Sequence, residues 1–241
     1  MSKSIAVFGA GPGLGQAVAR RYAQGGYDVV LVARRRQSLD VFAQDLIGNG
    51  ANAHVITADL ADPDAVPELA ERIRAVTGEP DSLYYAPTPD QGFVAAAELT
   101  AQRAQDYMPL IFYSLLALVQ QFLPHMIDER SGAILTAQGA STVRGLPHMS
   151  GPGPAQAAQR NYLQSLHSEV ADKGVYVGML YIGALIESSA FHTQSEEAKT
   201  AGVGRDWGPT VNPAHLADVL WEMHRTKIPE ETIYPEPNFD S

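Results

Sequence analysis

The sequence predicts an α/β fold in which a doubly wound parallel sheet carries helices on both faces, giving a three-layer sandwich. Short apolar runs alternate with segments of helical spacing along the whole chain. The apolar runs also lack polar alternation, as expected for parallel strands buried on both faces. No linker or repeat interrupts this order. With 241 residues, 45% of them hydrophobic, the chain suits one globular domain over 1–241.

The N-terminal half begins with a strand and a turn. Residues 5–8 form a short apolar run directly before a glycine cluster. Residues 15–24 place Val18, Ala19 and Tyr22 on one helical face, and the β-branched run DVVLVA at 28–33 indicates the second strand. By the same signals we expect a helix over 38–47, a strand over 54–60, a helix over 64–76 and a strand over 82–86.

The C-terminal half starts with helical spacing over 99–128, where Pro109 is expected to mark a joint because proline lacks an N–H donor. Residues 187–212 are richer in Gly, Ser, Thr and charge, so we expect a loop or lid there. The last helix is expected over 212–224, with Asn212 as its N-cap and Pro213 at its first position. Between the segments 99–128 and 187–212 we expect a strand over 132–137, a helix over 154–172 and a strand over 175–182.

Composition excludes several classes of function. The net charge of −10 argues against nonspecific nucleic-acid binding, which depends on Lys and Arg neutralising phosphates. The absence of cysteine excludes disulfides, thiolate catalysis and cysteine-ligated metals, and it fits the cytoplasm. The N-terminal apolar run is too short for a signal peptide, and no stretch reaches 18 apolar residues. We therefore expect no transmembrane helix and no membrane partner.

The glycine cluster predicts a nucleotide site. FGAGPGLG places Gly9, Gly13 and Gly15 between the first strand and the first helix, where a Rossmann-type dinucleotide fingerprint lies. Glycines let the backbone turn tightly and approach a pyrophosphate, and the helix start at Leu14 offers N–H groups and the positive end of a dipole. A plain tight turn is the structural alternative, but the strand–turn–helix context favours nucleotide binding.

The end of the second strand points to the kind of nucleotide. A protein that prefers NAD usually has an acidic residue there, which accepts a hydrogen bond from the ribose 2′-hydroxyl. This chain has LVARRR, so Arg34 and Arg35 can pair with a 2′-phosphate, while Asp40 lies too far along. NADP(H) is therefore favoured over NAD(H). A solvated turn is the alternative, and for Arg36 it is the favoured interpretation.

With these motifs the chain resembles the short-chain dehydrogenase/reductase family over nearly all of its length. The family pattern T-G-x-x-x-G-x-G matches residues 8–15, with Phe8 in place of the threonine. The closing IYPEP is similar to the tail of a divergent subgroup with atypical active sites. The resemblance implies further cofactor contacts from Asp59, Leu60, Ala86 (all that is left of the family's N-N-A-G), Gly183 and Ser188, or Ser189 if the alignment shifts by one residue.

The family's catalytic side chains are missing from the positions where this resemblance places them. The family uses a serine, a tyrosine, a lysine and an asparagine as a hydrogen-bonding and acid–base set. Alignment without gaps puts them at Gly139, Pro152, Gln156 and Ile111, and a shift would move the asparagine to Pro109. The stretch SGPGPAQAAQ at 150–159 thus keeps the helix start without the tyrosine and lysine.

Two nearby side chains are candidates for the remaining chemistry. Ser141 can hydrogen-bond a carbonyl, and His148 titrates near neutral pH and can donate a proton, although a surface-loop histidine is the favoured interpretation. Tyr84 and Tyr85 replace two asparagines at the cofactor edge, where packing is as well supported as catalysis. His192 and His215 lack metal-ligand spacing, so we assign no metal.

Three functions stay open at this point. The first is an NADP(H)-dependent oxidoreductase with an atypical active site that acts on a small carbonyl or alcohol. The second is a catalytically inactive binding or regulatory protein on the same fold, and the third is a lyase or isomerase without redox chemistry. The resemblance implies interface helices at 109–127 and 154–171, and the apolar character of the first favours a homodimer or homotetramer.

Overall fold

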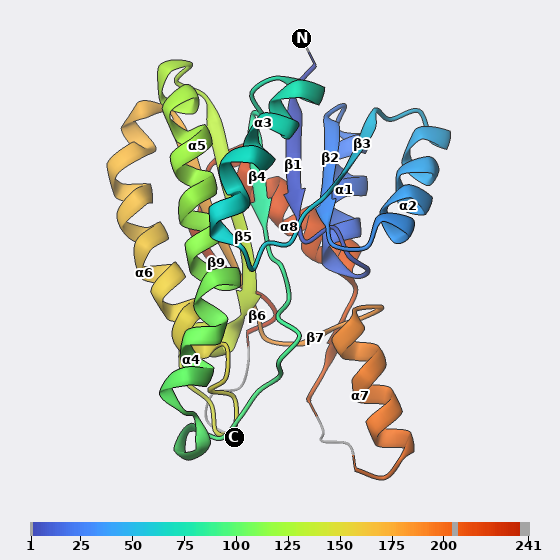
Figure 1. The fold of residues 1–241 in the computed structure, drawn as a ribbon, viewed down its shortest axis with the longest axis vertical. Coiled ribbons are helices and arrows are strands. Elements are labelled where there is room, and N and C mark those ends of the chain that lie inside the picture. The colour runs from blue at the N-terminus through green and yellow to red at the C-terminus, as the bar shows by residue number, and fades with distance from the viewer. Residues whose placement is uncertain (1, 204–206, 237–241) are drawn as a thin grey trace.

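The computed structural model describes residues 2–203 and 207–236. A seven-stranded parallel sheet in the order β3-β2-β1-β4-β5-β6-β9 runs through its centre (Figure 1). The strands are β1 (Ser4–Phe8), β2 (Asp28–Ala33), β3 (Ala53–Thr57), β4 (Ser82–Tyr85), β5 (Gly132–Gly139), β6 (Val175–Ile182) and β9 (Glu231–Ile233). The predicted fold class is therefore confirmed.

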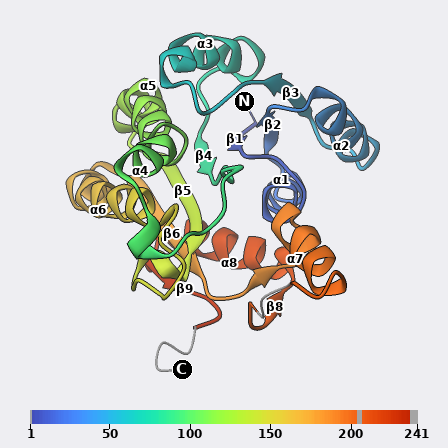
Figure 2. The same ribbon diagram turned by 60° about the horizontal axis from the view of Figure 1, so that its bottom comes forward.

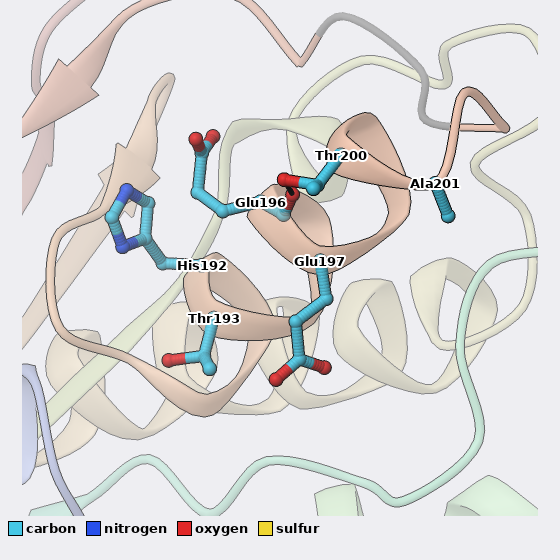
Figure 3. A pocket seen from close by; sticks show the side chains of 6 residues that line it. All are labelled: His192, Thr193, Glu196, Glu197, Thr200 and Ala201. Atoms are coloured by element: carbon cyan, nitrogen blue, oxygen red, sulfur yellow. Dashed lines mark hydrogen bonds between the residues drawn. The ribbon is translucent and has the colours of Figure 1, made fainter.

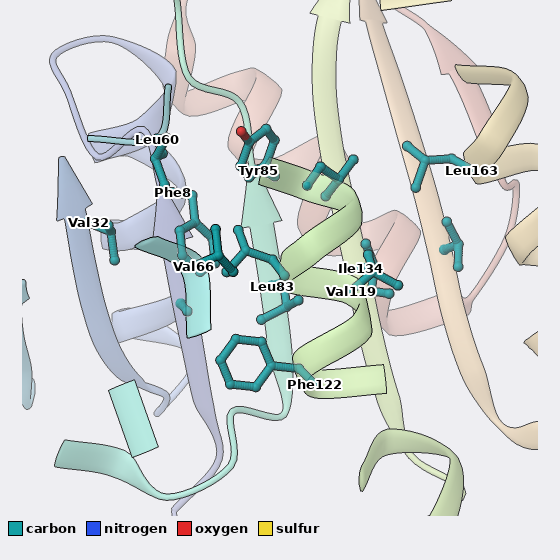
Figure 4. Close-up of a cluster of buried hydrophobic side chains, with 14 of the residues drawn as sticks. Phe8, Val32, Leu60, Val66, Leu83, Tyr85, Val119, Phe122, Ile134 and Leu163 are labelled. Carbon is teal, nitrogen blue, oxygen red and sulfur yellow. The ribbon is translucent and has the colours of Figure 1, made fainter. Parts of the chain in front are cut away.

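Helices cover both faces of the sheet. They are α1 (Leu14–Gln24), α2 (Arg36–Gly48), α3 (Val66–Thr77), α4 (Ala101–Met108), α5 (Ser114–Asp128), α6 (Gly153–Val170), α7 (Ala190–Thr200) and α8 (Pro213–Thr226). One core cluster joins α3, α5 and α6 to the sheet (Figure 4), and the other joins α1, α2 and α8 to the opposite face (Figure 1).

Strand β2 shows why the strands are apolar throughout. Val30 and Val32 lie in the first core cluster, whereas Val29 and Leu31 lie in the second. Successive side chains of a strand point to opposite faces, so a sheet covered on both sides needs apolar residues at every position. All four of these side chains are fully buried.

The order of the strands fixes where a ligand can lie. The chain winds outward from β1 to β3 on one side and from β4 to β6 on the other, so the direction of winding reverses between β1 and β4. In such sheets, ligands bind in the crevice at the carboxyl ends of the strands beside this reversal. Figure 2 turns that edge toward the reader.

Several expected boundaries need correction. The expected strand over 54–60 ends at Thr57, which leaves Asp59 and Leu60 in the following loop. The expected strand over 132–137 continues to Gly139. Strand β9 was not predicted, because edge strands are short and its three residues carry little pattern.

The expected loop or lid over 187–212 contains a helix. Ser189 caps α7 by accepting a hydrogen bond from the backbone N–H of His192. The helix is largely polar and so lacks the apolar spacing that would reveal it. Two-residue strands β7 (Leu185–Ile186) and β8 (Thr210–Val211) pair beside it. Residues 204–206 of this expected lid lie outside the described residues.

Pro109 does mark the expected joint. Residues Pro109–Tyr113 form a π-helical turn between α4 and α5. The continuous stretch Ala101–Asp128 has the length and hydropathy of a membrane-spanning helix. Its side chains Leu115, Leu118 and Phe122 are nevertheless buried in the core cluster against the sheet, so one side of this helix is a core face. Figure 4 shows Phe122 in this cluster.

Candidate functional site

The glycine turn after β1 is built so tightly that side chains do not fit. A Cβ atom on Gly15 would lie 2.1 Å from the carbonyl oxygen of Gly9, and one on Gly9 would lie 2.9 Å from the carbonyl of Ala86. Gly9 and Gly13 also adopt φ angles of 91° and 90°, which L side chains rarely adopt. At Gly11, by contrast, a Cβ would meet nothing within 4 Å.

This turn leaves an anion site at the start of α1. Gly13 is the N-cap residue and offers no side-chain oxygen to the first N–H groups of the helix. Those groups and the helix dipole attract negative charge. The turn therefore fits the pyrophosphate of a dinucleotide, as the sequence predicts for Gly9, Gly13, Leu14 and Gly15.

The start of α7 lies on the same turn. A Cβ on Gly13 would be 3.1 Å from the Cβ of Ser189, so these backbones are in contact although they are far apart in sequence. Ser188 is exposed, with a φ of 59°. Of the two serines left open by the alignment, Ser189 is thus the one in contact with the glycine turn.

Arg34 does not stand alone at the end of β2. Its Nη1 and Nη2 atoms donate to the two carboxylate oxygens of Asp90 at 2.6 and 2.7 Å. This hydrogen-bonded pairing lowers the pKa of Asp90 and raises that of Arg34. Arg35 is exposed at the N-cap of α2, and Arg36 pairs with Asp40 at 2.8 Å. Asp90 was not singled out by the sequence, because it lies 56 residues away in the chain.

The other predicted cofactor contacts are spread around this edge. Asp59 is exposed, and its Oδ1 accepts from the N–H of Ala61 at 3.0 Å. Leu60 is buried, and its carbonyl accepts from Ser114 Oγ at 2.7 Å. The N–H of Ala86 donates to the carbonyl of Phe8 at 3.1 Å, which ties β4 to the glycine turn. Gly183 directly follows β6 and is half-buried.

A small cavity lies at the carboxyl ends of β4 and β5. Its volume is about 20 Å³, which is room for about one water molecule. It adjoins the glycine turn through Ala86, whose carbonyl borders Gly9. The lining residues are Tyr85, Ala86, Pro87, Ile111, Ala137, Gln138, Gln156 and Gln159. Ile111 and Gln156, two of the aligned positions, thus meet in this cavity. Gly139 ends β5 and Pro152 is the N-cap of α6, beside the lining residues in the chain.

Amide groups connect the walls of this cavity. Gln138 Nε2 donates to Gln159 Oε1, and Gln159 Nε2 donates to the carbonyl of Ile111 in the π-helical turn. Thr142 Oγ1 donates to Gln156 Oε1 at 3.2 Å. Sequence reasoning missed Gln138 and Gln159. The available signals were a polar residue at the end of a buried strand and a second glutamine three positions after Gln156.

The two tyrosines of β4 face different surroundings. Tyr85 lines the cavity, but its hydroxyl donates to the carbonyl of Leu110, and burial raises its pKa well above the usual range. Tyr84 lies in the opposite core cluster, and its buried hydroxyl makes no hydrogen bond to any residue that the structure describes. Tyr181, at the end of β6, donates to Glu231 Oε1 at 3.1 Å and is buried.

Ser141 and His148 do not line the cavity. Ser141 lies in a short turn after β5, where its Oγ is buried and makes no hydrogen bond among the described residues. His148 is exposed in the loop before α6, with a φ of 60°. The structure therefore places neither residue among those that line the cavity between β4, β5 and α6.

A second, larger hollow lies elsewhere among the described residues. It measures about 600 Å³ and is lined by His192, Thr193, Glu196, Glu197, Thr200 and Ala201 (Figure 3). All six residues come from α7 and the position that follows it, so one helix forms the whole lining. A hollow bordered by one helix cannot surround a ligand.

Comparison with known proteins places these features in a family. An uncharacterized oxidoreductase of Mycobacterium tuberculosis is 28% identical over 233 residues, which cover 93% of this chain and 65% of that relative. This chain thus spans less than two thirds of the relative's length. The L-sorbose reductase of Gluconobacter frateurii, complexed with NADPH and L-sorbose, has a similar fold with a TM-score of 0.85 at 22% identity, over 100% of this chain and 98% of that one.

An NADPH-bound short chain oxidoreductase of Pseudomonas aeruginosa, described as containing an atypical catalytic center, gives a TM-score of 0.83 at 22% identity. The match covers 98% of this chain and 97% of that one. The family model for the short chain dehydrogenases matches residues 3–199, which include the glycine turn and the amide-lined cavity. This chain therefore belongs to the short chain dehydrogenase family.

Proposed function

We propose that this protein is an NADP(H)-dependent oxidoreductase that acts on a small carbonyl or alcohol through an atypical site of amide side chains. The cavity at the carboxyl ends of β4 and β5 carries the proposal. Tyr85 is the one titratable residue among the eight that line it, and its hydroxyl is already bound to a carbonyl. The family's tyrosine, lysine, serine and asparagine align with Pro152, Gln156, Gly139 and Ile111.

The cofactor would be held mainly by backbone. Gly9, Gly13 and Gly15 would admit the pyrophosphate against the N-terminus of α1, because no Cβ atoms obstruct it. Arg34 would exchange Asp90 for the 2′-phosphate of NADP(H), since its planar guanidinium matches either partner in a bidentate pair. The NADPH complexes of the Gluconobacter and Pseudomonas proteins support this choice of cofactor.

The reaction site would orient its substrate without transferring a proton from the protein. When bound, the nicotinamide supplies or accepts the hydride. The amides of Gln138, Gln156 and Gln159 can donate and accept hydrogen bonds, but they do not ionise near neutral pH. A proton would then come from solvent, so activated or already polarised carbonyls would react best.

The same observation favours a second function. Amide groups bind ligands well and are poor acids and bases, so this site also suits a catalytically inactive protein that senses or carries NADP(H). The two functions share the cofactor and differ in turnover. A substrate panel with NADPH separates them, because an inactive protein would oxidise NADPH with none of its members.

We further propose a cytoplasmic homodimer or homotetramer assembled through α5 and α6. Tyr113 is 45% exposed at the start of α5. Phe112 packs against Tyr162 of α6 with ring centroids 5.8 Å apart, which joins the two helices into one partly exposed aromatic surface. Light scattering at micromolar concentration should give the mass of two or four chains. A monomer would contradict this assembly.

The cofactor is tested by calorimetric titration with NADPH and with NADH. We expect NADPH to bind more tightly, and Arg34→Ala to lose about 1–3 kcal/mol of NADPH affinity, the value of a charged hydrogen bond left unmade. Arg36→Ala is the matched control, because Arg36 pairs with Asp40 on its own helix. Tighter binding of NADH, or binding of neither nucleotide, would contradict the proposal.

A further inference from the structure

One buried acceptor at the cavity has no partner. Gln138 is 9% exposed, and its Oε1 makes no hydrogen bond among the described residues. Native proteins rarely leave a buried polar atom unpaired, and each such atom calls for a bound water, an ion or a ligand. Because Gln138 lines the cavity, a group bound there can supply the missing donor.

The orientation of this amide is set by its neighbours. The backbone carbonyl of Ile111 can only accept a hydrogen bond, so Gln159 must present its Nε2 to it. Gln159 then turns its Oε1 toward Gln138, so Gln138 must donate a hydrogen bond to it from its own Nε2. In this chain of hydrogen bonds from Gln138 through Gln159 to Ile111, the atom left without a partner among the described residues is therefore the acceptor Gln138 Oε1.

A free donor lines the same cavity. Gln156 lies one helical turn before Gln159 on α6, and its Oε1 already accepts from Thr142 Oγ1. Its Nε2 makes no hydrogen bond within the part of the chain that the structure describes. The cavity thus offers one acceptor and one donor from two neutral side chains.

We propose that Gln138 and Gln156 together bind an amide-type group, a carboxamide or a lactam. Its N–H would donate to Gln138 Oε1, and its carbonyl would accept from Gln156 Nε2. A simple ketone satisfies only the second contact and leaves Gln138 unpaired, so the site selects against it. This inference rests on the proposed function, because it takes the cavity as the reaction end of the cofactor cleft.

Two molecules can bring an amide-type group to this place: a substrate or the nicotinamide of the cofactor. Both offer the same hydrogen-bonding pattern. The cavity itself has room only for the polar end of either molecule, so the remainder would lie outside it. A trapped water is the competing occupant, and it would show no preference for amides.

The experiment compares three ring compounds of matched size: δ-valerolactam, δ-valerolactone and cyclohexanone. Their affinities are measured by ligand-observed NMR on the full chain, both free and saturated with NADP⁺. The variants are Gln138→Met, Gln156→Met and the control Gln120→Met, which alters an exposed glutamine of α5. Gln156 is only half-buried, so its variant is expected to fold even if Gln138→Met does not.

If a substrate amide occupies the site, the saturated wild type should bind the lactam about tenfold more tightly than the lactone or ketone. Each cavity variant should remove that preference without changing the affinity for NADPH. If the nicotinamide carboxamide occupies it, the variants should instead weaken NADPH binding about tenfold, and the lactam preference should appear only in the free protein.

Equal binding of the three compounds in both states, together with an unchanged NADPH affinity in both variants, would overturn the inference in favour of trapped water. This failure is distinct from failure of the proposed function. Wild type that binds neither NADPH nor NADH would refute the proposed function, while the lactam comparison on the free protein would still test the amide site.

Discussion

The two ends of the crevice are built in opposite ways. At the glycine turn the backbone determines the structure. Gly9, Gly13 and Gly15 lie so close to neighbouring atoms that a single added Cβ would clash. At the β5–α6 end the backbone path is kept, whereas the side chains that meet there are amides. The scaffold of a family depends on backbone packing, whereas its chemistry depends on a few side chains, so the two can vary separately.

The largest effect on the free energy of unfolding is expected at the glycine turn, where backbone atoms pack closely. Gly15→Ala would place a methyl group 2.1 Å from the carbonyl oxygen of Gly9, so α1 must move away from β1. We expect a loss of about 3 kcal/mol or more in the free energy of unfolding, with loss of nucleotide binding. Chemical denaturation and calorimetry check both effects.

Gly11→Ala is the matched control in the same turn, because its added Cβ meets nothing within 4 Å. It should change the free energy of unfolding by less than about 1 kcal/mol. Equal effects of the two substitutions would remove the argument that close backbone packing defines this end of the crevice.

A buried histidine near the amino ends of β1 and β2, at the opposite edge of the sheet from the glycine turn, should give the protein a pH-dependent stability. His224 of α8 stacks on Tyr22 of α1 and pairs with its hydroxyl at 2.8 Å. Burial, reinforced by the charges of Lys3 and Lys227, lowers the pKa of His224 from 6.5 to about 4. Between these values the unfolded chain binds the proton and the folded chain does not, so stability is complete above pH 6.5 and falls as the pH falls toward 4.

The expected contribution of this histidine is on the order of 2–3 kcal/mol across that window. Urea denaturation of wild type and His224→Gln at about pH 7 and about pH 4.5 measures it. Wild type should lose more stability on acidification than the variant, by about that amount. Parallel losses in the two proteins would show that His224 ionises equally in the folded and unfolded chains.

The smallest effect is expected at Arg34 and Asp90. Their side chains are 56% and 73% exposed, so the pair itself contributes little to stability. Under the proposed function, Asp90 would compete with the 2′-phosphate for Arg34 and would repel it. Asp90→Asn should therefore raise NADPH affinity by about threefold to fivefold, or up to about 1 kcal/mol, and leave NADH affinity unchanged.

Asp40→Asn is the control for this prediction, because Asp40 holds Arg36 in a similar exposed pair. Titration calorimetry at low ionic strength is the measurement, since salt screens exposed charges. A parallel gain for NADPH and NADH in Asp90→Asn would assign the effect to general acidity of the cleft rather than to the 2′-phosphate.

Sequence reasoning reached the parts of the molecule that follow periodic patterns. The first six strands, the joint at Pro109 and the cap at Asn212 carry local signals, and the structure has all of them. The helix α7 has too few apolar residues to be recognised, and β9 is too short. Both depend on contacts with distant segments: Ser189 with Gly13, and Glu231 with Met179.

In the candidate site, too, local patterns could be predicted from the sequence and contacts between distant segments could not. The glycine turn was predictable, because its three glycines stand at a fixed spacing within one short stretch. The hydrogen bonds between the amides could not be predicted, because Gln138, Gln159 and the carbonyl of Ile111 come from three segments that only the folded chain brings together. The sequence around a glutamine also does not indicate whether its side chain is buried and paired.

We propose that the amide-lined cavity lacks a proton donor of its own. The most direct test of this proposal is NADPH oxidation by wild type with unactivated ketones and activated carbonyls, between about pH 6 and pH 9. We predict turnover of simple ketones about 10²–10⁴-fold below ordinary enzyme rates of about 10 per second, without an inflection in the pH profile. Fast turnover of simple ketones, governed by a group that titrates in this range, would contradict the account.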